Sequence, residues 1–135
     1  MILELLAALA LAVQPEAPPA APVADLIAKA EAYLRSQQDS ASGGWAVAPA
    51  GANFPAITGL VVNGLLLEPR GGDDADAAEG VAYILTFRRP DGGLYDKLLP
   101  SYNTAICLSA LARSDSPAAK AAIKPAQDFL RGLQY

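Results

Sequence analysis

A pattern of helix, polar joint, glycine pair and apolar residue occurs twice in this sequence. The first copy, "AEAYLRSQQDSASGGW", spans residues 30–45, and the second, "AEGVAYILTFRRPDGGLY", spans residues 78–95. Gly43 and Gly92 are 49 residues apart. A period of this length that contains two helices is typical of one supersecondary unit used repeatedly. It therefore predicts an array of helical hairpins, and no other feature constrains the fold as strongly.

Amphipathic helices are predicted to form the outer layer of these hairpins. The first covers residues 23–38, where apolar residues recur at i, i+3, i+4, i+7 and i+11, which is one face of a helix. A third outer helix is predicted to begin with Ser116 as N-cap and Pro117 at its first position. Pro125 within it predicts a kink or a break near Lys124, because proline lacks the backbone donor that a helix interior needs.

Two nearly all-apolar segments are predicted to be inner helices. They are "FPAITGLVVNGLLL" (54–67) and "SYNTAICLSALAR" (101–113). The β-branched residues of the first would also suit a strand, but fourteen residues is long for one. Ser101 or Asn103 is available to cap the second. Helices that are apolar nearly all round are expected in the interior of the protein.

The joint between outer and inner helix explains the glycine pair and the Trp that follows it. Gly43 and Gly44 allow the chain to reverse, because glycine tolerates positive φ. Trp45 is then expected to fold back against the helix ends as a plug between neighbouring hairpins, and the Gln38 side chain to hydrogen-bond exposed backbone there. In this interpretation the Trp is structural and performs no chemistry.

The first 22 residues differ in composition from the rest of the chain. "LLAALALAV" is an apolar run of nine, too short to span a bilayer, and Ala10-Leu11-Ala12 suits signal peptidase. Residues 1–13 are therefore predicted to be a signal peptide for export. No Lys or Arg precedes the run, so an apolar first turn of a helix in a cytoplasmic protein is the alternative. Residues 14–22 contain four prolines and read as a stiff linker.

Charge and residue usage exclude several classes of function. The net charge is -4, with no basic cluster, which argues against nucleic-acid binding. The chain has no His, which removes the usual neutral-pH acid–base group and the usual zinc ligand. Its single Cys107 excludes an internal disulfide and a multi-cysteine metal site. Neither a metal nor another cofactor is therefore expected.

The motif at the first joint resembles a known family signature. Tyr33, Leu34, Gln38, Gly43 and Trp45 follow the order aromatic, Leu, Gln, Gly, Trp of the repeat in squalene–hopene and oxidosqualene cyclases, with one extra residue between Gln and Gly. The wider prenyltransferase and squalene-cyclase repeat group shares this signature in looser form.

Two further copies of the signature are partial. The second keeps an aromatic residue and the glycine pair, but an Arg replaces the Gln and a Leu replaces the Trp. The third has its aromatic, Leu and Gln, and the chain stops one residue later. The residues of these copies are Tyr83, Arg88, Gly92, Gly93 and Leu94 in the second, and Phe129, Leu130 and Gln134 in the third.

The resemblance implies an all-α protein of the α/α-toroid class, in which inner helices surround an apolar cavity. Residues 23–135 would supply two hairpins and the start of a third, an incomplete ring. The cavity in that family holds a polyisoprene and stabilises carbocations with aromatic faces. The rim residues Phe54, Tyr95, Tyr102 and Asn103 are then candidates to contact an apolar ligand, while capping and packing are their alternative roles.

The catalytic acid of the hopene-forming cyclases has no clear match. Those enzymes use Asp-x-Asp-Asp, whereas Asp73, Asp74 and Asp76 form Asp-Asp-x-Asp in the joint before an outer helix. Their alternative role is structural: one of them caps that helix, and the others are negative charges that the helix dipole favours near its N-terminus. The zinc site of the protein prenyltransferases needs a His, which is absent. Asp91 before its glycine pair is similarly typical of a turn.

Two functions remain open on the sequence alone. One is a terpene cyclase-like or mutase-like protein, of which this chain is a fragment, acting on an isoprenoid. The other is a non-catalytic toroid that binds apolar ligands or protein partners. The chain on its own is predicted to leave its inner helices exposed, so that further repeats or self-association cover them, whereas a stable monomer would favour the non-catalytic module.

Overall fold

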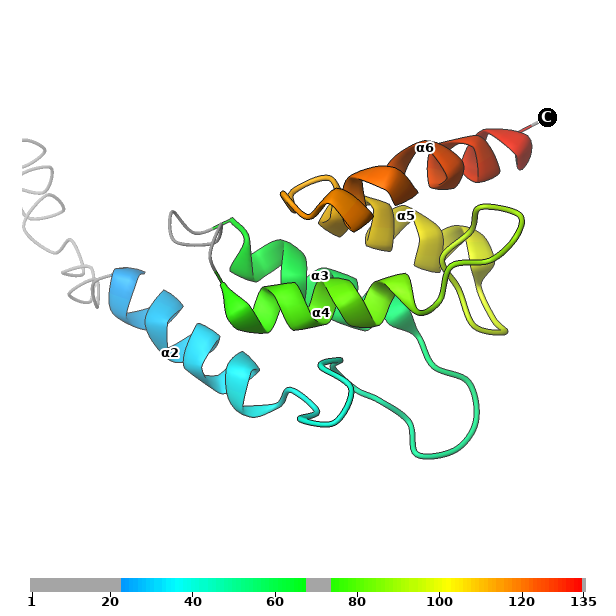
Figure 1. Cartoon of the computed structure of the whole chain (residues 1–135). Helices are drawn as coiled ribbons and strands as arrows, with labels where there is room; N and C mark the ends of the chain where they lie inside the picture. The colour runs from blue at the N-terminus through cyan, green and yellow to red at the C-terminus, as the bar shows by residue number, and fades with distance from the viewer. Residues whose placement is uncertain (1–22, 68–73, 135) are drawn as a thin grey trace, which may run out of the picture. The chain divides into compact units, whose positions relative to one another are not determined.

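The computed structural model describes residues 23–67 and 74–134, which contain five α-helices (Figure 1). The helices are α2 (Val23–Ser36), α3 (Pro55–Leu65), α4 (Ala75–Leu85), α5 (Pro100–Leu111) and α6 (Pro117–Gly132). Within these ranges the only β-pairing is an isolated bridge between Arg88 and Leu94. The all-α prediction is thus confirmed for the described residues. The predicted signal peptide (1–13) and linker (14–22) lie outside them.

The chain divides into two compact units, residues 1–30 and 31–135, and the packing below is that of the second unit. Its central contact is between α3 and α5, and each of these helices also packs against the helix that follows it in the chain. The physically packed hairpins are therefore α3–α4 and α5–α6 (Figure 1). By contrast, none of the residues of α2 is buried. Among the outer helices, the inner helix α3 therefore packs mainly against α4, and the inner helix α5 mainly against α6. Neither packs mainly against the outer helix that precedes it in the chain.

The core lies between these two pairs of helices. Leu65, Ile84 and Leu111 are among its largest fully buried side chains. The alanines of α6 that face this core let the helix approach closely, since they present only a methyl group. These residues are Ala119, Ala122 and Ala126.

The helix starts follow local sequence signals. Pro55, Pro100 and Pro117 each occupy the first turn of a helix, where the missing N–H is not needed. Asp74 caps α4 by accepting the Ala77 N–H at 3.0 Å. Ser116 caps α6, as predicted, by accepting a backbone N–H from the first turn.

One local prediction is wrong, and another is wrong in part. Neither Ser101 nor Asn103 caps α5, because the helix begins earlier and its N-cap is Leu99, in the left-handed conformation at φ 51°. Of the kink or break predicted near Lys124, the break does not occur, because α6 continues through Pro125. The helix has enough neighbouring turns and buried alanines to hold the residues on both sides of the proline.

The inner helices are less enclosed than the sequence predicts. Ile57 and Leu60 on α3 are 39% and 54% exposed, and Tyr102 on α5 is 52% exposed. Each helix buries one side against its neighbours and leaves the other side uncovered. The prediction that these helices are interior on all sides is therefore wrong for the described residues.

Candidate functional site

The first joint is held by Gln38 and Trp45. Gln38 Nε2 donates to the Gly43 carbonyl at 2.9 Å and to the Asp76 carbonyl at 3.0 Å. The Trp45 indole N–H donates to the Leu34 carbonyl at 2.7 Å, and its side chain is 3% exposed. The expected roles of Gln38 and Trp45 at the helix ends match this geometry. Both side chains donate hydrogen bonds to backbone carbonyls, so their role in the joint is structural.

The second joint repeats one contact of the first. The backbone N–H of Trp45 donates to Thr58 Oγ1 at 2.9 Å, and the backbone N–H of Leu94 donates to Thr104 Oγ1 at 2.9 Å. Both threonines are fully buried. Each inner helix thus presents a buried hydroxyl to the residue that follows the glycine pair.

Both joints also pack their first glycine against an outer helix. Gly43 has φ +75°, and a Cβ there would lie 2.8 Å from Cβ of Glu79 on α4. Gly92 has φ +91°, and a Cβ there would lie 2.5 Å from the carbonyl oxygen of Pro125 on α6. Glu79 and Pro125 are 46 residues apart, so the two glycines contact equivalent turns. Glycine is needed at both positions for its conformation and for the close approach.

The acidic run before α4 forms an ion-paired cap. Arg35 at the end of α2 donates two hydrogen bonds to Asp74, the shorter at 2.5 Å, and a third to Asp76 at 2.6 Å. The hydrogen bonds from Arg35 hold the pKa of Asp74 below its ordinary value. Asp74 therefore stays ionised and is unsuited to protonate an alkene, in agreement with the capping alternative. Asp73 lies outside the described residues.

Asn103, a ligand-cavity candidate, is fully buried and engaged in structural bonds. Its Nδ2 donates to the carbonyls of Leu98 and Leu99 at 2.9 and 3.1 Å. Its Oδ1 accepts the Ala56 N–H at 3.1 Å. Asn103 thereby joins the starts of α3 and α5, and brings the candidate Phe54, at the N-cap of α3, to the same end of the inner layer.

The two tyrosine candidates differ in their surroundings. The Tyr95 hydroxyl donates to Asp91 Oδ2 at 2.6 Å, which raises the pKa of the tyrosine, and its ring stacks on Phe129 with 5.7 Å between centroids. Tyr95 is thus packed between its own joint and α6. Tyr102 lies in the first turn of α5 with its side chain half exposed. Of the four candidates, Tyr102 is the one with a large surface open to a ligand.

The remaining motif residues are divided between core and surface. Tyr83 is buried and meets Phe87 edge to face, and Phe129 is partly buried against Tyr95. Tyr33 is 65% exposed, although it occupies the equivalent place in the first copy. Gln134 is exposed.

A polar link between the two joints was not expected from the sequence. Asp96 Oδ2 accepts the Asn53 N–H at 3.0 Å, and Arg89 donates to the Asp96 carbonyl at 2.5 Å. Asn53 Oδ1 in turn accepts the Ala48 N–H at 3.0 Å. No periodic or motif signal marks these residues, because the link depends on how loops 43 residues apart meet.

The exposed side of α3 and α5 is the most distinctive surface of the unit. Neither helix contains a charged residue; α3 exposes Ile57 and Leu60 at one flank of this surface, and α5 exposes Tyr102 at the other. Arg113, which follows α5, donates to Asn63 Oδ1 of α3 at 3.1 Å at the end of the surface. A water-facing helix normally carries charge on its outer side, as α4 and α6 do. We call this surface the uncharged face; it can offer apolar contact and no acid–base chemistry of its own.

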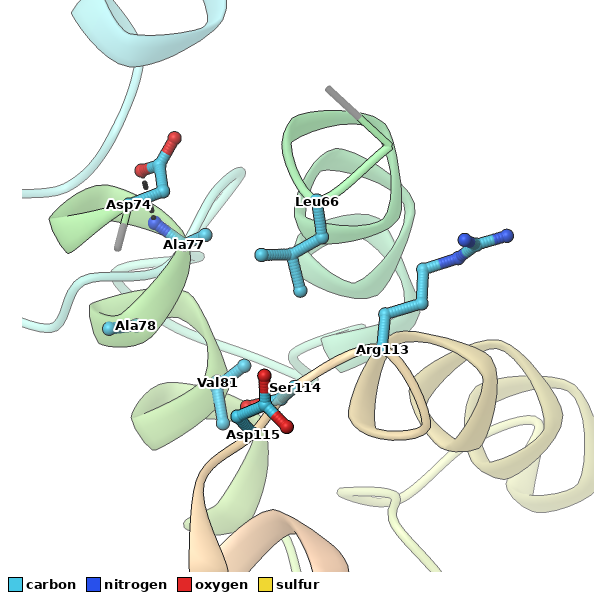
Figure 2. A pocket seen from close by; sticks show the side chains of 8 residues that line it. All are labelled: Leu66, Asp74, Ala77, Ala78, Val81, Arg113, Ser114 and Asp115. Carbon is cyan, nitrogen blue, oxygen red and sulfur yellow. Dashed lines mark hydrogen bonds between the residues drawn. The ribbon is translucent and has the colours of Figure 1, made fainter. Parts of the chain in front are cut away.

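A small pocket lies between α3, α4 and the connection from α5 to α6 (Figure 2). Its volume is about 40 Å³, enough for water but not for a ligand of isoprenoid size. In Figure 2 the Arg113 side chain points away from Val81, and Asp74 bonds back to its own helix. The lining residues are Leu66, Asp74, Ala77, Ala78, Val81, Arg113, Ser114 and Asp115.

Residues 23–67 and 74–134 offer little support for other site chemistries. No group of three or more His, Cys, Asp or Glu in these ranges could hold a metal ion. Cys107 is buried, and burial raises the pKa of its thiol to about 12. No helix in the described part of the chain is long and apolar enough to cross a membrane.

Comparison with protein-family models, with curated proteins and with solved structures found no match for this chain.

Proposed function

We propose that residues 23–135 are helical-hairpin repeats of the α/α-toroid type and that their uncharged face binds an apolar, isoprenoid-like ligand. The observation that carries the proposal is this face itself: two adjacent helices without a charged residue, exposing Ile57, Leu60 and Tyr102. Apolar surface of this kind gains free energy when it is removed from water.

The repeat is supported by the paired geometry of the two joints. The same hydroxyl contact recurs at Thr58 and Thr104, and the same close glycine contact recurs at Gly43 and Gly92. These contacts follow the cyclase-like signature of the sequence, even where Leu94 replaces its Trp. An inner layer of α3 and α5, backed by α4 and α6, is the arrangement that a toroid segment requires.

Binding is favoured over catalysis for this stretch. The Asp74 carboxylate accepts hydrogen bonds from Arg35 and from the N-terminus of α4, which favour its ionised form, so it carries no proton to donate. In a longer protein that supplies an acid, the same face would line the cavity of an isoprenoid cyclase, and this chain would be a fragment of that enzyme. If no such acid is supplied, this chain is a non-catalytic module that binds its ligand through the uncharged face.

The test is titration of the folded chain with a fluorescent farnesol derivative. Leu60→Glu and Tyr102→Glu each introduce a charge into the uncharged face and should weaken binding at least about tenfold. Ala121→Glu on the exposed side of α6 is the matched control and should leave the affinity unchanged. Equal affinities in all four proteins would reject the proposal.

Export remains a separate proposal, because the predicted signal peptide lies outside the described residues. Cleavage after Ala10-Leu11-Ala12 would leave a mature chain that begins at Val13. N-terminal sequencing of the protein from its native host tests this, and an intact Met1 would reject it.

A further inference from the structure

The second helix pair exposes the positions that the first pair buries. On α3, Ala56 donates its N–H to Asn103 of α5, and a Cβ at Gly59 would lie 3.4 Å from the Cys107 backbone. Ala56 and Gly59 are both buried. The α3 side of the α3–α5 contact therefore consists of small residues one turn apart, which allows the two backbones to approach closely.

The equivalent positions on α5, 46 residues later, are Tyr102 and Ala105, and both are exposed. The same difference holds for the outer helices. Ala77, Val81 and Ile84 on α4 are at most 4% exposed, whereas Ile123, Gln127 and Leu130 on α6 are only partly buried. We call the surface of Tyr102, Ala105, Ile123, Gln127 and Leu130 the trailing face.

For a second set of equivalent positions the difference in burial is reversed, because α5 buries them and α3 exposes them. Asn103 on α5 is fully buried and Ile106 partly buried, and both face α3. Their equivalents on α3 are Ile57 and Leu60, which are exposed. We call the surface of Ile57 and Leu60 the leading face. The molecule thus presents both halves of its own α3–α5 contact, the leading face at the α3 flank of the uncharged face and the trailing face at its α5 flank.

We infer that a second copy of this chain docks head to tail, with its leading face against the trailing face of the first copy. This inference rests on the repeat proposed above. The occupant follows from the continuity of an interface within the chain: α3 of the second copy offers apolar residues at the positions from which α5 already packs against α3. Such a heterologous contact does not close in a pair, so dimers and longer assemblies form as concentration rises.

One residue limits the strength of this contact. Tyr102 stands where the internal contact has the small Ala56, so the incoming helix cannot approach as closely. Tyr102→Ala restores the small side chain and should strengthen self-association by about tenfold or more. A weaker association of this variant would contradict the proposed geometry.

Size-exclusion chromatography with light scattering, in the absence of any ligand, tests the inference. The wild-type chain should show a mass that rises above the monomer with concentration. Leu60→Glu on the leading face and Ala105→Glu on the trailing face should each be monomeric. An equimolar mixture of the two variants should give a dimer and nothing larger, because one leading and one trailing face remain intact. Ala121→Glu should behave as wild type.

A helical wild-type chain that stays monomeric at all concentrations would overturn this inference and leave the proposed repeat standing. A mixture of the two variants that remains monomeric would overturn the head-to-tail geometry. Circular dichroism of each protein distinguishes these outcomes from misfolding: a wild-type chain without helical signal would contradict the proposed hairpin fold and this inference together.

Discussion

The backbone N–H of Trp45 lies 2.9 Å from the buried hydroxyl of Thr58, and the indole fills the space behind it with 3% of its surface exposed. Leu94 and Thr104 make the same contact in the second joint, again at 2.9 Å. An apolar side chain after the glycine pair is thereby tied to the inner helix that follows. The two joints therefore position α3 and α5, the helices that carry the uncharged face.

Trp45→Ala should lower the free energy of unfolding by about 3–5 kcal/mol, because the substitution leaves a cavity beside α4. Trp45→Phe retains most of the burial and loses the bond to the Leu34 carbonyl, so it should cost about 1 kcal/mol plus a smaller cavity effect. Denaturant unfolding measures both. A loss below about 1 kcal/mol for Trp45→Ala would mean that the Trp does not pack as described.

Gly92→Ala should destabilise the protein more than Gly51→Ala. Both glycines have positive φ, so both substitutions introduce backbone strain of about 1–2 kcal/mol. Only at Gly92 would the new Cβ also meet a backbone atom, the Pro125 carbonyl, whereas Gly51 has open space around it. The difference in unfolding free energy should be about 1–3 kcal/mol. Equal losses would contradict the packing of this joint on α6.

The Arg35–Asp74 pair should make stability depend on pH in the acid range. The pKa of Asp74 is lowered in the folded state, so its contribution is complete above the unfolded pKa of about 3.9 and is lost as pH falls through the lower, folded value. Asp74→Asn keeps a capping side chain but loses the charge. Its unfolding free energy should be lower than that of wild type near neutral pH, and the gap should close as the solution is acidified.

Arg35→Gln provides the matched control for this effect. In that background Asp74→Asn should change the acid profile much less, because the partner that lowers the pKa is gone. Arg35 remains about one-third exposed, so solvent screens the pair and a large effect is not expected. A gap between wild type and Asp74→Asn that persists unchanged in acid would contradict the role of the carboxylate charge.

Cys107 should not react with thiol reagents in the folded protein at a pH of about 8, near the pKa of a free thiol. Its thiol is buried in the core and its pKa is raised to about 12, so little thiolate forms and the reagent has no access. Labelling with a chromogenic disulfide should follow global unfolding and become rapid in denaturant. Fast labelling under native conditions would show that α5 opens locally.

Much of the fold could be predicted because its signals are local. Proline or a short polar cap marks the start of each helix from α3 to α6, and periodicity separates the amphipathic helices from the uniformly apolar ones. The spacing of Thr58 and Thr104 follows from the repeat, and so does the burial of the residue after the glycine pair. Asp74 as a cap was also readable, since an acidic residue before a helical segment has few other roles.

The remaining features depend on contacts between distant segments. Asn103 carries the sequence signal of a cap, but its buried side chain donates to the Leu98 and Leu99 carbonyls before α5 and accepts the Ala56 N–H at the start of α3. Pro125 remains helical because α6 is anchored by buried alanines on both sides of it. The partner of each inner helix and the link between Asn53 and Asp96 depend on tertiary packing, for which a single sequence has no periodic signal.

The central claim is that the uncharged face of α3 and α5 binds an apolar ligand. Amide NMR of the labelled chain, titrated with farnesol at a protein concentration where the chain is monomeric, tests it most directly. Chemical-shift changes should concentrate at Ile57, Leu60, Tyr102 and Ala105 and saturate with ligand. The amides of Ala78 and Ala82, on the exposed side of α4, should remain unshifted. Shifts confined to α4, or no saturable shifts at all, would contradict the account.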